Sequence, residues 1–85
     1  MAYKVEVLRS AAHELEALPP PVRRRVRRAI VALSDEPRPH GALLLAGQER
    51  IWRVRVGDYR VLYRIEDDLV LVLVIRIRHR RDAYR

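Results

Sequence analysis

Residues 51–65 read IWRVRVGDYRVLYRI, so that arginine alternates with bulky apolar residues. In a β-strand this period sends Arg53 and Arg55 to one face and Trp52, with its apolar neighbours, to the other. The Gly57-Asp58 step in the middle predicts a tight turn between two antiparallel strands. Such a sheet has an apolar face for a core and a cationic face that fits phosphate, because a guanidinium stays charged and binds two phosphate oxygens at once. We therefore expect a nucleic-acid substrate or partner.

Two predicted strands flank this turn, at residues 50–56 and 59–66, and Asp67-Asp68 predicts the next turn. Residues 69–75 read LVLVLVI, and a run that is apolar on both faces predicts a central strand buried above and below. Arginine alternation then resumes. By parity, three arginines share a face if the strand continues past Ile77: Arg76, Arg78 and Arg80.

The first half of the chain predicts a strand followed by two helices. Residues 3–8 alternate as a strand does, and Ser10 is the predicted N-cap of the first helix. Pro19-Pro20-Pro21 must end that helix, because proline donates no intrahelical hydrogen bond, and a second helix begins about there. Residues 37–41 form a turn-rich connector, and residues 42–48 a loop with some local order. The outer face of the second helix is basic: Arg23, Arg24, Arg25, Arg27 and Arg28.

Length and composition limit the choice of protein class. Residues 1–85 suffice for one small domain, and a net charge of +7 favours polyanionic partners. Without cysteine there is neither a disulfide nor a thiolate metal site, and His13, His40 and His79 are too scattered for zinc, so we expect no cofactor. The apolar run at residues 69–75 is too short to span a bilayer, and no signal peptide is evident, so we expect a cytoplasmic protein without a membrane partner.

The predicted class is α+β, a small antiparallel sheet packed against an N-terminal helical hairpin in the order β-α-α-β-β-β. The phrase RVRVGDYRVLY at residues 53–63, followed by IRHRRDAYR at 77–85, resembles the RelE toxin family of the wider RelE/ParE group. The Leu18-Pro19 hinge and DEPRP at 35–39 are similar as well, so that the resemblance covers nearly the whole chain. It implies a fold related to microbial ribonucleases. It also implies a toxin that cleaves messenger RNA in the ribosomal A site without a metal, and that an acidic RelB-like antitoxin neutralises.

The resemblance also implies site residues. Arg53 and Arg55 match two basic strand positions that are often lysine in the family, and Arg60 matches the arginine after the turn. Arg80 and Tyr84 match the basic residue and the tyrosine of the C-terminal segment. We expect all five to bind RNA and to act in catalysis. Fixed guanidiniums suit the neutralisation of phosphoryl oxygens, and Tyr84 suits base stacking or proton transfer.

The sequence departs from the family pattern at the general base, where arginine replaces lysine. Arginine, with a pKa above about 12, is a poor substitute for a catalytic lysine, and Lys4 is the only lysine in the chain. Proton removal then falls to His79, to Glu49, to ribosomal RNA or to solvent, and histidine has a suitable ordinary pKa of about 6.5. Arg78 is a further expected RNA contact because it shares the face of Arg80.

Each of these positions also has an alternative interpretation without a functional role. Exposed arginines on an open sheet face are often only solvated, and the basic run Arg23–Arg28 is either a solvated helix face or a docking surface for ribosome or antitoxin. Trp52, Tyr59 and Tyr63 share the core-facing parity and are expected in the core. Two rival functions also remain: a ParE-like DNA gyrase inhibitor without nuclease activity, and an inactive relative retained for antitoxin binding and repression.

Overall fold

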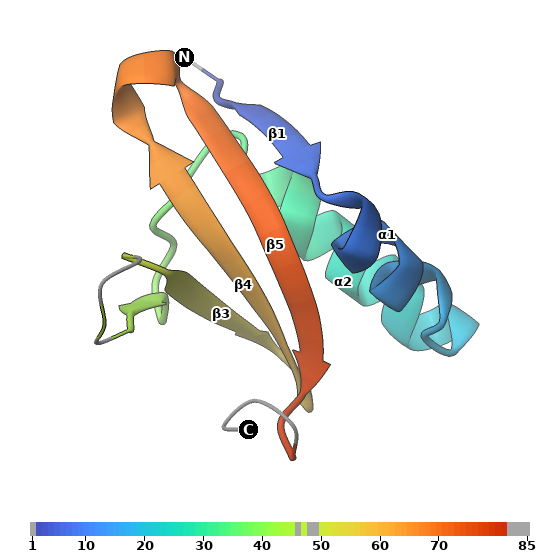
Figure 1. Ribbon diagram of the computed structural model, residues 1–85. Coiled ribbons are helices and arrows are strands. Elements are labelled where there is room, and N and C mark those ends of the chain that lie inside the picture. The colour runs from blue at the N-terminus through green and yellow to red at the C-terminus, as the bar shows by residue number, and fades with distance from the viewer. Residues whose placement is uncertain (1, 46, 48–49, 82–85) are drawn as a thin grey trace.

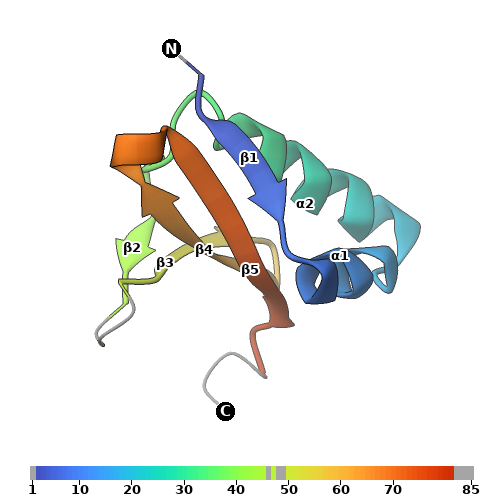
Figure 2. The same cartoon turned by 45° about the horizontal axis from the view of Figure 1, so that its top comes forward.

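The computed structural model describes residues 2–45, 47 and 50–81. The described elements are β1 (Lys4–Val7), α1 (Arg9–Glu16), α2 (Pro20–Ala32), β2 (Leu43–Leu44), β3 (Trp52–Val56), β4 (Tyr59–Glu66), the 3-10 helix η1 (Asp67–Leu69) and β5 (Leu71–His79). The strands form a sheet in the order β1-β5-β4-β3-β2, and both helices lie on one side of it (Figures 1 and 2). The predicted α+β class and the order of its main elements are confirmed.

The sheet is mixed, because one of its pairings is parallel. β1 runs parallel to β5, whereas β5, β4, β3 and β2 pair antiparallel with their neighbours. A parallel pair cannot be closed by a tight turn, and here the helical hairpin provides the start of the long connection. The predicted loop at residues 42–48 contains the short strand β2, whose Leu43 and Leu44 pair with Arg53 and Trp52.

The predicted cap of α1 is wrong. The helix begins at Arg9, and Leu8 holds the N-cap position with an extended backbone (φ −60°, ψ 150°) and no side-chain cap. The Leu8 N–H donates to the carbonyl oxygen of Val74 at 2.9 Å, so pairing with β5 keeps the chain extended up to the residue where the helix starts. The expected proline boundary is confirmed, since α2 begins at Pro20, where a missing N–H leaves no hydrogen bond unmade. No helix of the described residues is long and apolar enough to cross a membrane.

Two predicted strand starts are wrong for the same physical reason. Arg50 has a φ of 54° and Val70 a φ of 50°, and this left-handed backbone is incompatible with an extended strand. The strands therefore begin later, at Trp52 and Leu71. A β-branched residue such as Val70 rarely adopts this conformation, so the turn that ends η1 is locally strained.

The central position of β5 is confirmed, but its burial on both faces is not. Val72 and Val74 are fully buried beneath the helices, whereas Leu71 and Leu73 on the opposite face are only half-buried. The helices cover one face of the sheet, and no described element covers the other (Figure 2). We call this second face the open face.

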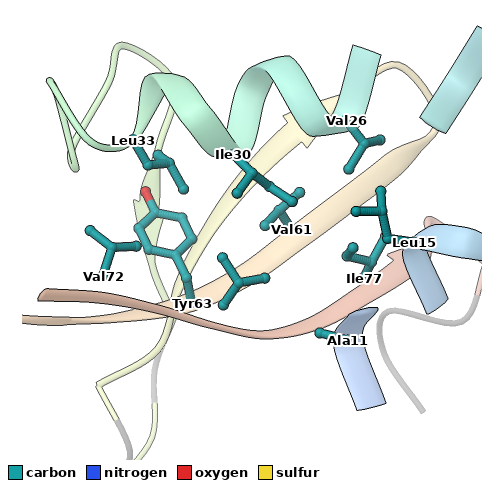
Figure 3. Packing of buried hydrophobic residues seen from close by; sticks show 10 residues of the cluster. Ala11, Leu15, Val26, Ile30, Leu33, Val61, Tyr63, Val72 and Ile77 are labelled. Atoms are coloured by element: carbon teal, nitrogen blue, oxygen red, sulfur yellow. The ribbon is translucent and has the colours of Figure 1, made fainter. Parts of the chain in front are cut away.

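The core lies between the helices and the sheet (Figure 3). Apolar side chains at helical spacing on α1 and α2 meet alternate side chains of β4 and β5, and burying each contributes about 1.5–3 kcal/mol. The expected core-facing aromatics are confirmed, with Tyr63 fully buried and Trp52 and Tyr59 packed against its cluster. The buried cluster consists of Ala11, Leu15, Val26, Ile30, Leu33, Val61, Tyr63, Val72, Val74 and Ile77.

Asp67 binds Arg38 and Tyr3 at the η1 end of the sheet, and we call these three residues the ionic clasp. Arg38 contacts Asp67 with two nitrogens, at 2.8 and 3.4 Å, and its guanidinium lies 5.3 Å from the ring centre of Trp52. The Tyr3 hydroxyl donates to the same carboxylate at 2.7 Å. Hydrogen bonds from Arg38 and then from Tyr3 hold the pKa of Asp67 below its ordinary value. This clasp joins the start of β1, the α2–β2 connection and the β4–β5 turn.

The buried hydroxyl of Tyr63 anchors the same connection from inside. It donates to the carbonyl oxygen of Pro37 at 2.7 Å, and burial raises the pKa of Tyr63 to about 12. A raised folded-state pKa means that the neutral phenol favours the folded state. Its contribution is therefore complete below the unfolded pKa of about 10 and is lost as the pH rises through 12.

We predict that Tyr63→Phe lowers the free energy of unfolding by about 1–3 kcal/mol at pH 7, because the Pro37 carbonyl loses its buried donor. The variant should also lose less stability than the wild type between about pH 9 and 11.5. Urea titrations across that range measure both effects. Equal stability of the two proteins at pH 7 would contradict the anchoring role of the hydroxyl.

Candidate functional site

An irregularity in β5 decides which of its side chains reach the open face. Tyr63 of β4 pairs with Val74, and the preceding residue, Leu62, pairs with Arg76, so Ile75 is an extra residue in the ladder. Such a β-bulge reverses the alternation of the strand. Without it, Arg76 would share the parity of Val74 and point into the core. With it, Ile77 is buried in the core and Arg76 points outward.

The register then sets five arginines side by side on the open face. Arg60 of β4 pairs with Arg55 of β3 on one side and with Arg78 of β5 on the other. Two residues further along β4, Leu62 pairs with Arg53 of β3 and with Arg76 of β5. Directly opposed side chains in an antiparallel pair have Cβ atoms about 4.5–5.5 Å apart. We call these five residues the arginine rows: Arg53, Arg55, Arg60, Arg76 and Arg78.

The inner members of the arginine rows are partly buried. Arg53, Arg60 and Arg78 are half-buried, and Nε of Arg53 and Nε and Nη1 of Arg60 are shielded from solvent. Arg55 is exposed. Facing like charges destabilise a sheet, and shielding from water strengthens their repulsion. An anion placed across the rows would be attracted by several guanidiniums at once, so the face suits negative charge.

Two carboxylates border the arginine rows at the β3–β4 turn and at α1. Arg80 lies just past β5, where its N–H donates to the Asp58 carbonyl at 2.7 Å and its Nε lies 3.8 Å from the Asp58 carboxylate. Glu14 of α1 approaches Arg78, with Oε2 3.9 Å from Nε. Sequence reasoning missed Glu14, because it is 64 residues from Arg78 in the chain and no local pattern links the two.

A further arginine reaches this end of the sheet from the helix layer. A Cβ added to Gly57 would lie 3.4 Å from both terminal nitrogens of Arg25, so the guanidinium rests against the turn. Gly57 has a φ of 60°, a conformation in which glycine carries no steric cost. Arg25 therefore adds positive charge at the β3–β4 turn. The sequence placed it only on the outer face of the second helix.

The other predicted site residues lie apart from the arginine rows or outside the described residues. His79 pairs with Tyr59 and so shares its helix-side face; the two rings meet edge to face at 5.1 Å. Its Nδ1 accepts a hydrogen bond from the Arg81 N–H at 3.2 Å. Tyr84 and Glu49 lie outside the described residues, and their roles remain predictions.

The arginine rows can hold phosphate groups and neutralise charge that develops on them. They cannot remove a proton at neutral pH, because a guanidinium stays protonated. Strands carry these side chains, and strands fix a side chain more firmly than a loop does. The open face is therefore suited to holding anions and not to removing protons.

Comparisons with known proteins identify the family and the fold. Residues 5–84 match the family described as the ParE toxin of type II toxin–antitoxin systems, parDE. Toxin RelG of Mycobacterium tuberculosis is 37% identical, with 100% of this chain and 99% of the relative covered. Among solved structures, RelE in the RelE–RelB complex of Pyrococcus horikoshii superposes with a TM-score of 0.84 at 27% identity, covering 98% of this chain and 100% of that chain. The toxin–antitoxin complex RelBE2 of M. tuberculosis gives 0.84 at 32% identity, covering 96% and 95%.

The family match spans nearly the whole chain, and the fold and the arginine rows fall within it. They define a small toxin of the RelE/ParE superfamily. The chain belongs to the RelE family of type II toxin–antitoxin toxins, as the resemblance in its sequence predicted.

Proposed function

We propose that this chain is an endoribonuclease that cleaves messenger RNA in the ribosomal A site and so inhibits translation in the cytoplasm. The observation that carries the proposal is the row of Arg55, Arg60 and Arg78 across three strands of the open face. A solvated sheet face gains nothing from three cations in direct opposition, whereas a phosphate backbone does. Kinship with the RelE family supports the choice of reaction and of ribosomal context.

The proposed reaction is attack of a ribose 2′-OH on the adjacent phosphorus, with departure of the 5′-oxygen. Arg55, Arg60 and Arg78 neutralise the phosphoryl oxygens, on which negative charge builds up in the transition state. Arg53 and Arg76 hold neighbouring phosphates of the same strand. The proton of the 2′-OH goes to an acceptor outside the arginine rows, because every member of the rows is already protonated.

Two further residues of the C-terminal segment complete the proposal. Arg80, which is more than half exposed beside Asp58, contacts a phosphate at the end of the rows. Tyr84 stacks on a base next to the scissile bond, a contact worth about 1–3 kcal/mol per base. The family implies the role of Tyr84; its position outside the described residues leaves that role a proposal.

The main test is cleavage of labelled messenger RNA on programmed ribosomes. Arg60→Ala should lower the single-turnover rate by about 10²–10³ while the fold persists, because its guanidinium stabilises charge that is present only in the transition state. Arg64→Ala is the matched control: it lies on the same face of β4, but pairs with Glu66 at 3.2 Å, away from the rows. Equal activity of Arg60→Ala and wild type would place the site elsewhere.

A second candidate function is inhibition of DNA gyrase. The match to a family described as ParE toxin favours it, and the fold cannot decide, since function lies in the site and not in the scaffold. A supercoiling assay run beside the ribosome assay separates the two. Loss of supercoiling without messenger RNA cleavage supports the ParE-like function. Loss of neither, together with antitoxin binding, supports an inactive relative.

His79 offers a test of the proton acceptor. It lies on the helix side with Tyr59, and its Nδ1 is already engaged, so we assign it a structural role. We predict that His79→Gln leaves the cleavage rate within about 3-fold of wild type and the pH profile unchanged between about 5 and 8. A slower reaction with an altered profile would instead make His79 the general base or acid.

We further propose that an acidic, RelB-like antitoxin neutralises the toxin, as an antitoxin accompanies the toxin in the related solved complexes. One helix of the partner packs on the helical hairpin, residues 11–33, or beside the sheet. Half-buried Leu71 and Leu73 and the 51%-exposed Leu43 leave the open face suited to such a helix. A second, acidic segment pairs with Arg55, Arg60 or Arg80.

Titration of the neighbouring gene product against the toxin tests this mechanism. The association rate should fall steeply as salt rises from about 0.05 to 0.5 M, because opposite charges steer the encounter and salt screens them. Messenger RNA cleavage should stop at saturation. Association that is independent of salt, with cleavage continuing in the complex, would rule the mechanism out.

A further inference from the structure

β5 extends beyond the strand that borders it. β1 pairs with Leu71–Val74 only, whereas β5 continues to His79. On this side, residues 75–79 face no described strand. The chain turns from β1 directly into α1, and α1 packs alongside this stretch of β5 (Figure 1). A helix offers no ladder of main-chain partners, so side chains of α1 must meet the edge of β5.

Glu14 is the side chain of α1 that meets this edge. Its Oε1 accepts a hydrogen bond from the main-chain N–H of Ile77 at 2.8 Å. Its Oε2 lies 3.9 Å from Nε of Arg78, the next residue along β5. The side chain is 28% exposed and that of Arg78 34%, so both are largely withdrawn from solvent. One carboxylate thus contacts the backbone of β5 and a member of the arginine rows together.

We propose that Glu14 is a positioning residue, which fixes the guanidinium of Arg78 within the arginine rows. The inference rests on the proposed ribonuclease function. The bond to Ile77 holds the carboxylate in place, and the fixed carboxylate then restrains the long side chain of Arg78. Arg78 faces Arg60 across the ladder, and like charges directly opposite each other in a sheet repel. Glu14 offsets this repulsion from the side away from Arg60.

A positioning role and a simple charge effect predict opposite changes in RNA binding. Glu14 is negative, so removing its charge makes the surface more attractive to phosphate. If the carboxylate mattered only through its charge, a neutral substitute would tighten binding and would not slow the reaction. If it positions Arg78, the same substitute lowers the rate of the chemical step although binding is undiminished. The KM-against-kcat split therefore separates the two.

The test uses Glu14→Gln, whose amide oxygen can still accept the Ile77 N–H but carries no charge. On programmed ribosomes, kcat should fall between about 10-fold and 100-fold, the effect of a catalytic group displaced by about an ångström, while KM stays equal or falls. Glu16→Gln is the matched control. It removes the same charge from the same helix, but Glu16 pairs with Arg27 on α2, at 2.9 Å, away from the arginine rows.

A double-mutant cycle with Arg78→Ala shows whether Glu14 acts through Arg78. In that background, Glu14→Gln should no longer change kcat, because the residue that it positions is gone. Thermal melts of each variant confirm that the compared proteins are folded. An unchanged kcat in Glu14→Gln, a raised KM with normal kcat, or an equal loss in the Arg78→Ala background would each overturn the proposal.

A measurement on the isolated toxin keeps this inference separable from the proposed function. The Nε–Hε signal of Arg78 in nitrogen-15 relaxation experiments should report a restrained side chain in wild type and Glu16→Gln, and a mobile one in Glu14→Gln. If wild-type protein cleaves no messenger RNA, the proposed ribonuclease function fails by itself. Equal mobility of Arg78 in wild type and Glu14→Gln overturns the positioning role, whatever the activity.

Discussion

One extra residue in β5, Ile75, controls the distribution of charge in this protein. On the β1-paired side of the bulge, Val72 and Val74 enter the core, and beyond it Ile77 does. A strand with unbroken alternation would send Arg76 and Arg78 toward the helices together with those valines. Burying two guanidiniums among apolar side chains is costly enough to prevent folding. The bulge reverses the alternation at the point where the sequence changes from valine to arginine, and so gives the sheet its cationic open face.

Stability and charge are concentrated at opposite ends of β4. Its Glu66 end adjoins the clasp of Arg38 and Asp67, and the buried Tyr63 hydroxyl binds the connection from inside. Its Tyr59 end, at the Gly57 turn, carries the facing arginines. Two carboxylates, Asp58 and Glu14, border the arginine rows from other elements.

The scaffold alone does not separate RelE-like from ParE-like activity, because both names occur among the proteins that this chain resembles. The side chains of the open face indicate more about the kind of ligand than the scaffold does. Arginines in direct opposition match the spaced charges of a phosphate backbone, and arginine binds such oxygens in pairs. The same residues cannot serve as bases. In the proposed function, proton transfer therefore falls to a group outside the arginine rows.

The sequence by itself determined what local periodicity can determine. Alternation at residues 52–65 predicted both strands, their turn and the face of each arginine, and the prolines predicted the break between the helices. Tertiary structure alone decided the bulge at Ile75, the parallel pairing of β1 and the approach of Glu14 to Arg78. The parallel pairing and the contacts of Glu14 join residues more than sixty positions apart, and the bulge depends on how β4 and β5 pair. No local pattern encodes such contacts, because they follow from which register lets the valines pack under the helices and keeps the arginines out.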